Sequence, residues 1–366
     1  ELALLAVQGE GVGAMADGSQ GPPMHTNVME VLVDIVVRST GEMTFMMMQR
    51  NQEPKNEPTR LMAALDQPGV SKALVEATVQ GWDGVASDAT RARLQILSRW
   101  LNWVSHNLMV AEIEKRQFAD EEAAGAEPGP QSADPPMPPL VCAILEAFPF
   151  FCHALDADEK PEEPFPTTYG TATRRLGRVR IELVDLLCTV ATVPHVDIAK
   201  AVASTGFMGM CFETMINFEW CNIVHAKITR AVVSMCNDVV NAVAPDVYYH
   251  FFIEYNILKR IIAVYKEDEE NRHVRHYASG YMGHVHVIAA SIQETVKILR
   301  EQGVQPGLTT PAQIVLQAVE NNNALSEWSL FLDLTLSEVI RVQTKALGQA
   351  EPEVVAEQND EYPTVD

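Results

Sequence analysis

Hydrophobic residues recur every three or four positions along most of this chain, which is the spacing of an amphipathic helix. The clearest case is a predicted helix over residues 88–117, where one stripe is apolar: Leu94, Leu97, Leu101, Val104 and Leu108. No segment alternates convincingly between apolar and polar residues for more than five positions, as a half-buried strand would require. The pattern therefore predicts an all-α protein.

Several predicted helices are apolar on two faces. In the helix predicted over residues 174–193, one stripe is Leu176, Val179, Leu183, Leu186, Leu187 and Val190, and the other is Ile181, Val184 and Cys188. A helix that is buried on two sides belongs in a stacked array rather than on the outside of a single bundle. Because no strict sequence repeat is visible, we expect an irregular armadillo/HEAT-like α-solenoid of stacked helix pairs.

Breaks in the helical pattern divide the chain into four parts. Residues 1–117 are predicted to form N-terminal helical repeats, and residues 118–139, which are acidic and contain six prolines, a linker or loop. Residues 140–348 form the predicted helical repeat core, and residues 349–366 an acidic, disordered tail. Shorter breaks fall within the core at residues 156–169, Pro194, Gly206, Pro245 and residues 303–307. The first residue is glutamate rather than methionine, which fits a chain whose N-terminal part is missing.

Charge is the strongest feature of the composition. The chain carries 27 basic and 49 acidic residues, a net charge of -22. Such a surface repels nucleic acid and anionic membranes, so we expect neither as a partner. No apolar run reaches the roughly 18 residues that a membrane span needs, and no signal peptide is visible.

The six cysteines include no CxxC pair, and four of them lie within apolar helical patterns. Reduced cysteine serves there as a small core residue. A reducing compartment is therefore expected, so we predict a cytoplasmic location, with the nucleus as a second compartment that meets the same requirement.

A cluster of histidines is the best metal candidate: His273, His276, His284 and His286. Zinc needs three or four converging ligands. On one helix, His284 and His286 would point about 200° apart, so they cannot share one ion. No cysteine lies nearby and no HExxH motif occurs. We therefore predict neither a metal nor another cofactor.

Two local strings stand out from the helical pattern. One runs from Phe218 to His225 as FEWCNIVH, and the other from Gly280 to His284 as GYMGH. Neither has the form of a catalytic motif, since GYMGH lacks the GxxxxGK[ST] of a phosphate-binding loop and no GxSxG is present. Upstream of both, the sequence LGRVRIELVDLL opens a long helical stretch.

Together these strings resemble the signature of the SAPS-domain family, the regulatory subunits of protein phosphatase 6-type Ser/Thr phosphatases. The family pattern has Leu-Gly-x-x-Arg, then Gly-Val-Leu, an aromatic-acidic-Trp-Asn-Asn-x-Leu-His string, and Gly-Tyr-Met-Gly-His. The residues that match it are Gly177, Arg180, Glu182, Leu183, Gly206, Phe218, Trp220, Asn222, His225, Gly280, Tyr281, Met282, Gly283 and His284. Cys221 departs from it, because it replaces the first Asn of the pair. The resemblance covers about residues 26–348 and is specific over residues 174–293.

The resemblance implies a function without catalysis. The chain would be a regulatory or scaffold subunit that binds a PPP-family Ser/Thr phosphatase catalytic subunit and directs its substrate choice, with further scaffold subunits as additional partners. The metals that support hydrolysis would belong to the catalytic subunit. The alternative is an α-solenoid adaptor in an unrelated complex, in which the two strings serve only to pack repeats together.

Eight residues are candidates either for partner binding or for packing between repeats: Arg180, Trp220, Asn222, His225, Thr229, Tyr281, Met282 and His284. Asn222, His225 and Thr229 fall at i, i+3 and i+7, so they form either a hydrogen-bond ladder between repeats or a row that faces a partner. Trp220 is either a packing anchor or an interface hot spot. The glycines of GYMGH favour a tight turn between two close helices, with Tyr281 and Met282 packed inward.

A basic run stands out in this acidic chain: Arg174, Arg175, Arg178 and Arg180. Cations at a helix start oppose the helix macrodipole, so we expect anionic partners for them. These partners are either acids of the same chain, such as Glu162 and Glu163, or the acidic surface of another protein.

Overall fold

The structure is a computed structural model that describes residues 67–82, 88–123, 137–156, 165–167, 170–172, 175–242, 244–320 and 325–344. Helices make up nearly all of these residues, so the predicted all-α class is confirmed. The helices predicted before residue 67 and the predicted acidic tail lie outside the described residues.

The elements follow one another with short connections. The first half of the described chain contains α4 (Pro68–Gln80), α5 (Asp88–Ala123), α6 (Pro139–Asp156), β1 (Phe165–Thr167), β2 (Gly170–Ala172), α7 (Arg178–Ala191), α8 (Val196–Ser204) and α9 (Phe207–Asn217). The second half contains α10 (Asn222–Asn237), α11 (Asp246–Tyr248), the π-helix η1 (Tyr249–Glu254), α12 (Ile257–Arg275), α13 (Met282–Glu301), α14 (Pro311–Glu320), α15 (Leu325–Leu330), the π-helix η2 (Phe331–Leu336) and α16 (Ser337–Thr344).

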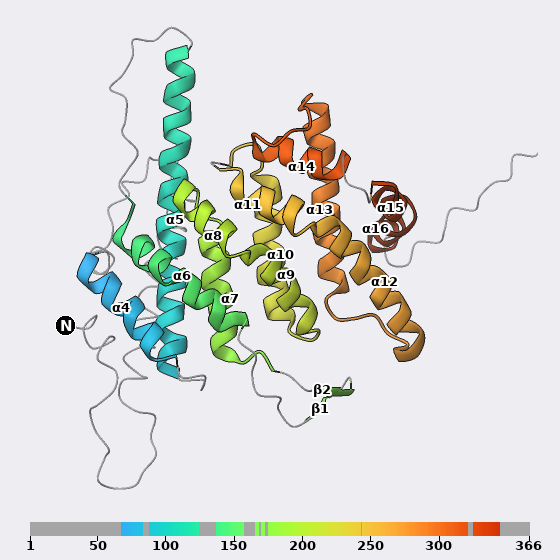
Figure 1. Ribbon diagram of the computed structural model, residues 1–366, viewed down its shortest axis with the longest axis horizontal. Coiled ribbons are helices and arrows are strands. Elements are labelled where there is room, and N and C mark those ends of the chain that lie inside the picture. Colours follow the sequence, from blue (N-terminus) through green and yellow to red (C-terminus); the bar gives the residue numbers. More distant parts are fainter. Residues whose placement is uncertain are drawn as a thin grey trace, which may run out of the picture.

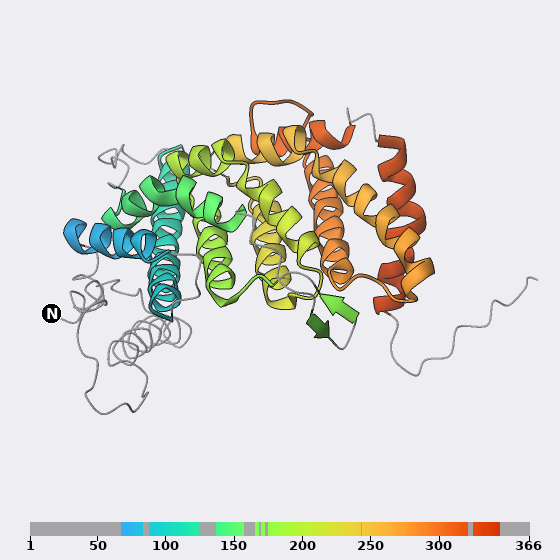
Figure 2. The same ribbon diagram turned by 60° about the horizontal axis from the view of Figure 1, so that its bottom comes forward.

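The helices stack beside one another along the long axis of the molecule (Figure 1). One row consists of α5, α7, α10 and α13, each packed against the next (Figure 2). A second row runs through α4, α6, α8, α11 and α14, which also contact one another in that order. Each helix therefore has neighbours on two sides, which accounts for the two apolar stripes in the sequence. This arrangement is compatible with the expected solenoid.

The core is built from large side chains that link successive layers. Trp100 of α5, Phe148 of α6 and Phe212 of α9 are fully buried. Phe148 also meets Phe207 edge to face, with ring centroids 5.8 Å apart, which ties α6 to α9.

By length and composition α6 is apolar enough to cross a membrane, so the expectation that no such run exists was wrong. Half of that helix is buried against α4, α7 and α8, as in a core helix of a stacked array.

Three boundaries differ from the prediction. Helix α7 begins at Arg178 rather than at residue 174, because Gly177 has φ 76° and ψ 157°, a conformation outside the helical region. Helix α5 continues to Ala123 instead of ending at residue 117, and it projects beyond the other helices (Figure 1). The short strand β1 lies inside the predicted break at residues 156–169 and pairs with β2 as an antiparallel hairpin, where only a loop was expected.

Candidate functional site

The two sequence strings form neighbouring turns at one end of the row of long helices. The first string makes the α9–α10 turn and the start of α10, and the second makes the α12–α13 turn and the start of α13. Helices α10 and α13 pack together along their length. A Cβ atom on Gly280 would lie 2.5 Å from the carbonyl oxygen of Glu219 and 2.9 Å from the Trp220 ring. Only glycine therefore allows the two turns to approach this closely.

His284 joins α13 to α10 through both of its ring nitrogens. Its Nε2 lies 2.8 Å from Oδ1 of Asn222, and its Nδ1 lies 3.1 Å from Oγ1 of Thr229. An amide oxygen only accepts, so Nε2 of a neutral ring donates to Asn222 while Nδ1 accepts from the Thr229 hydroxyl. Burial lowers the pKa of His284, which favours the neutral form that this pattern needs. Asn222 and Thr229 thus form two rungs of a ladder between helices.

His225 belongs to the same face of α10 but has a different role. Its side chain is fully buried, and Nε2 donates to the carbonyl oxygen of Phe218 at 2.9 Å, which closes the turn that precedes α10. The ring packs edge to face against His284 and Tyr281, at centroid distances of 5.5 Å and 6.5 Å. Nδ1 is buried and has no hydrogen-bond partner among the residues that the structure describes. Burial lowers the pKa of His225, so the folded protein favours a neutral ring.

Tyr281 and Met282 are buried, and Trp220 is not. Tyr281 is 6% exposed and Met282 2%, so both pack inward at the start of α13, and burial raises the pKa of the Tyr281 hydroxyl. Trp220 is 42% exposed and lies against Tyr277, with ring centroids 5.9 Å apart. Beside this pair, the guanidinium of Arg275 meets the carboxylate of Glu219 at 3.2 Å. We call Trp220 and Tyr277 the aromatic edge.

A buried carboxylate that the sequence did not single out fixes the second turn. Asp268 of α12 is 2% exposed. Its Oδ1 accepts from the backbone N–H of Ser279 at 2.7 Å, and its Oδ2 accepts from Arg272 at 2.8 Å. Only the i, i+4 spacing of Asp268 and Arg272 was visible in the sequence. The contact with Ser279 holds the turn in the position in which Gly280 meets Trp220.

The arginines of the basic run at the start of α7 have different surroundings in the fold. The guanidinium of Arg175 stacks 3.8 Å above the ring of Phe165 in β1, a cation–π contact that the sequence did not predict. Arg180 is half-buried in the first turn of α7, and Arg178 is exposed beside it. Glu162 and Glu163 lie outside the described residues, so their pairing with these arginines stays a prediction.

The four candidate metal-binding histidines do not converge. His273 and His276 are exposed at the end of α12, His284 faces α10, and His286 forms a hydrogen bond with Tyr265. Among the described residues, no group of three or more His, Cys, Asp or Glu side chains is arranged to hold a metal ion. The described part of the fold therefore offers a packing site and an exposed edge, and no assembled set of metal ligands.

Residues 197–345 match a family model described as SIT4 phosphatase-associated protein, SAPS. The resemblance to the SAPS family is confirmed. The matched segment extends from α8 to the end of α16, so both strings and the α10–α13 contact lie within it.

Two similar proteins have names that agree with this match. Serine/threonine-protein phosphatase 6 regulatory subunit 3-B of Xenopus laevis is 21% identical over 217 residues, which are 56% of this chain and 24% of that protein. Serine/threonine-protein phosphatase 6 regulatory subunit 3 of Gallus gallus is 19% identical over 338 residues, 89% of this chain and 36% of that protein. The chain thus spans about a quarter to a third of the length of these relatives.

Proposed function

We propose that this chain is a regulatory or scaffold subunit that binds a protein phosphatase 6-like Ser/Thr phosphatase catalytic subunit and directs its substrate choice. The observation that carries the proposal is the SAPS match over residues 197–345, supported by relatives that are named phosphatase 6 regulatory subunits. The chain itself would perform no hydrolysis. The metals and the reacting water would belong to the catalytic subunit.

A row of stacked helices suits this role because it offers a long surface on a rigid support. A subunit that holds the catalytic subunit at one position and a substrate at another makes their encounter intramolecular. The effective concentration of the substrate then rises to about the millimolar range for a short connection, without any new contact at the reaction centre. Substrate choice would follow from which proteins the array holds.

At the two turns, the aromatic edge is the part best suited to contact the catalytic subunit. Asn222, Thr229 and His284 are engaged with one another and His225 is buried, so of these four side chains only that of Asn222 is exposed. Trp220 and Tyr277 keep about two fifths of their surface exposed. Tryptophan and tyrosine are enriched among the residues that dominate binding energy at protein interfaces.

Affinity capture tests the proposal. The full chain, captured by affinity from its native source, should retain a PPP-type catalytic subunit, which mass spectrometry would identify. A Trp220→Ala variant that folds normally should retain less of it than the unchanged chain. Capture of the folded chain without any PPP-type catalytic subunit would favour an adaptor in an unrelated complex, in which the signature serves only to pack α10 against α13.

A further inference from the structure

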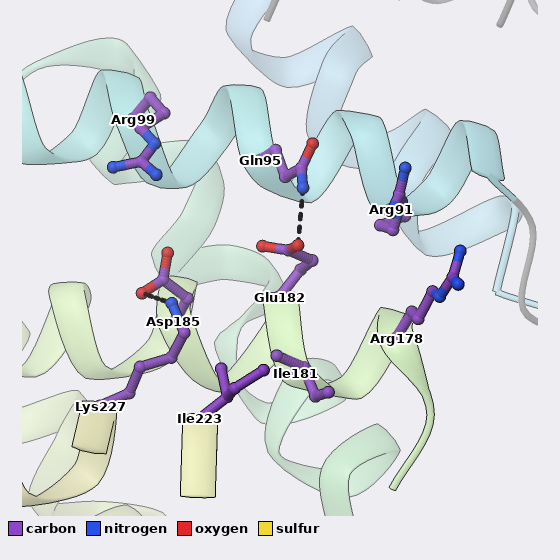
Figure 3. Close-up of a pocket in the computed structure, with 9 residues that line it drawn as sticks. All are labelled: Arg91, Gln95, Arg99, Arg178, Ile181, Glu182, Asp185, Ile223 and Lys227. Atoms are coloured by element: carbon purple, nitrogen blue, oxygen red, sulfur yellow. Dashed lines mark hydrogen bonds and ion pairs between the residues drawn. The ribbon is translucent and has the colours of Figure 1, made fainter. Parts of the chain in front are cut away.

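A groove lies where α5, α7 and α10 meet (Figure 3). Its volume is about 390 Å³. The residues that line it come from these three helices: Arg91, Gln95, Arg99, Arg178, Ile181, Glu182, Asp185, Ile223 and Lys227. We call it the basic groove. It is separate from the aromatic edge, and no step of the proposed function uses it.

The charge of the basic groove is opposite to that of the chain. Four of its side chains are cationic and two are carboxylates, within a chain of net charge -22. Both carboxylates already have partners in the protein. Glu182 accepts from Nε2 of Gln95 at 2.6 Å, and Asp185 accepts from Ser98 at 2.9 Å and also binds Lys227. Lys227 therefore neutralises the charge of Asp185, whereas Glu182 keeps its charge and is hydrogen-bonded by the neutral amide of Gln95.

Two arginines remain available to a ligand. Among the residues that the structure describes, neither Arg99 nor Arg178 forms an ion pair, and both are exposed at the groove (Figure 3). Arg91 lies on the same helix as Arg99, and it pairs at 3.9 Å with the carboxylate of Asp88 in that helix, with 28% of the Arg91 side chain exposed. Arginine presents a planar fork of donors that matches a carboxylate, so these side chains favour a carboxylate-bearing ligand.

The shape of the groove favours an extended chain over a compact ion. Arg91, Gln95 and Arg99 follow one another at i, i+4 and i+8 on α5, so the two arginines lie about 12 Å apart along the helix. An extended peptide covers that distance in about four residues. On the facing walls, Ile181 and Ile223 add apolar surface, and Ile223 is 61% exposed.

We propose that the basic groove binds an extended, Asp/Glu-rich segment of a partner protein. Two acidic side chains about four residues apart would meet the arginines of α5, a third would meet Arg178, and an apolar residue between them would cover Ile223. Opposite charge steers such a segment into the groove, whereas the remaining acidic surface of the chain repels it. For Arg178, the proposal takes the second of the two alternatives that the sequence left open, the acidic surface of another protein.

Fluorescence polarisation with labelled peptides tests this site directly. The probe is a peptide of about twelve residues, mostly Asp and Glu with a central Leu, and its control has every acid replaced by Asn or Gln. The acidic peptide should bind the full chain, and its affinity should fall as salt is raised from about 50 to 300 mM, since screening weakens exposed charge pairs. The neutral peptide should bind at least about tenfold more weakly, a difference of about 1.4 kcal/mol.

Charge reversal locates the binding. The double variant Arg99→Glu/Arg178→Glu should weaken binding of the acidic peptide at least about tenfold. The matched control, Lys200→Glu/Lys259→Glu, changes the net charge equally at exposed positions of α8 and α12, and it should stay within about twofold of the unchanged chain. If the glutamate variant fails to fold, Arg99→Gln/Arg178→Gln takes its place, with an expected loss of about threefold or more. Equal binding of the acidic and neutral peptides, or equal losses in the groove and control variants, would overturn the proposal.

Discussion

The contact between Gly280 and the Trp220 turn makes a sharp prediction for the variant Gly280→Ala. The added Cβ would lie 2.5 Å from the Glu219 carbonyl oxygen and 2.9 Å from the Trp220 ring, both closer than real Cβ contacts allow. Gly280 does not have a positive φ, so the alanine backbone itself is unstrained and the clash is the source of the destabilisation. Overpacking of this kind costs about 1–3 kcal/mol of the free energy of unfolding.

Gly283 provides the matched control, because it lies in the same string only three positions away. A Cβ atom on Gly283 meets no atom within 4 Å, and the residue lies in the first turn of α13. Gly283→Ala should therefore raise the free energy of unfolding by about 0.4–1 kcal/mol, since alanine restricts the unfolded chain more than glycine does. The two substitutions are chemically identical, yet they should change stability in opposite directions.

Urea unfolding, followed by tryptophan fluorescence and circular dichroism, measures both variants. Unfolding midpoints should fall for Gly280→Ala and rise slightly for Gly283→Ala, with a gap of about 1.5–4 kcal/mol between the free energies. Equal stabilities for the two variants would show that the turns before α10 and α13 do not meet as described, and the account of the α10–α13 contact would then be wrong.

Three further outcomes follow from the same geometry. Burial lowers the pKa of His225 below its ordinary value of 6.5, so the unfolded chain binds more protons than the folded one, and the stability that His225 contributes should be present above about pH 6.5 and fall as pH drops toward the lower folded-state pKa. Thermal melts of His225→Gln should therefore show a weaker pH dependence of stability than the unchanged chain. An unchanged dependence would exclude His225 as its source. Asp268→Ala leaves the buried N–H of Ser279 without its acceptor and should cost about 1–3 kcal/mol in urea unfolding, whereas a loss below about 0.5 kcal/mol would contradict the role of Asp268 in the turn. Trp220→Ala should weaken binding of the catalytic subunit about tenfold or more in calorimetry, with less than about 1 kcal/mol of lost stability. A larger loss of stability with unchanged binding would make Trp220 a packing residue.

Much of the fold was predictable because the spacing of apolar residues in each helix shows which of its faces are buried. Apolar spacing of three and four residues identified α5 and α7, and the two apolar stripes of α7 indicated neighbours on two sides. Helix ends were harder to predict. The start of α7 depends on the backbone conformation of Gly177, and a single glycine in a sequence does not reveal whether it ends a helix or lies within it.

The candidate site was predictable on one helix and not between helices. The spacing of Asn222, His225 and Thr229 revealed a polar face, but not which neighbour it meets. Their partner, His284, lies 62 residues beyond Asn222 in the sequence, with α11, η1 and α12 between them in the chain. His225 has the spacing of its neighbours yet turns toward Phe218, because its ring satisfies the carbonyl of its own turn.

The basic groove was hidden for the same reason. Arg91, Gln95 and Arg99 share a face of α5 at helical spacing, which is readable from the sequence. Arg178 and Lys227 come from two other helices, and their approach depends on how α7 and α10 stack. Contacts within one helix follow from its periodicity, whereas contacts between stacked helices require the tertiary arrangement.

The most direct measurement of the central claim mixes the purified full chain with a purified protein phosphatase 6-type catalytic subunit. Size-exclusion chromatography with light scattering then gives the mass of whatever elutes. The account predicts a stable complex of the two chains, with phosphatase activity in the complex and in the catalytic subunit and none in this chain alone. Separate elution of the two folded proteins at micromolar concentration, or hydrolysis by this chain without the catalytic subunit, would contradict it.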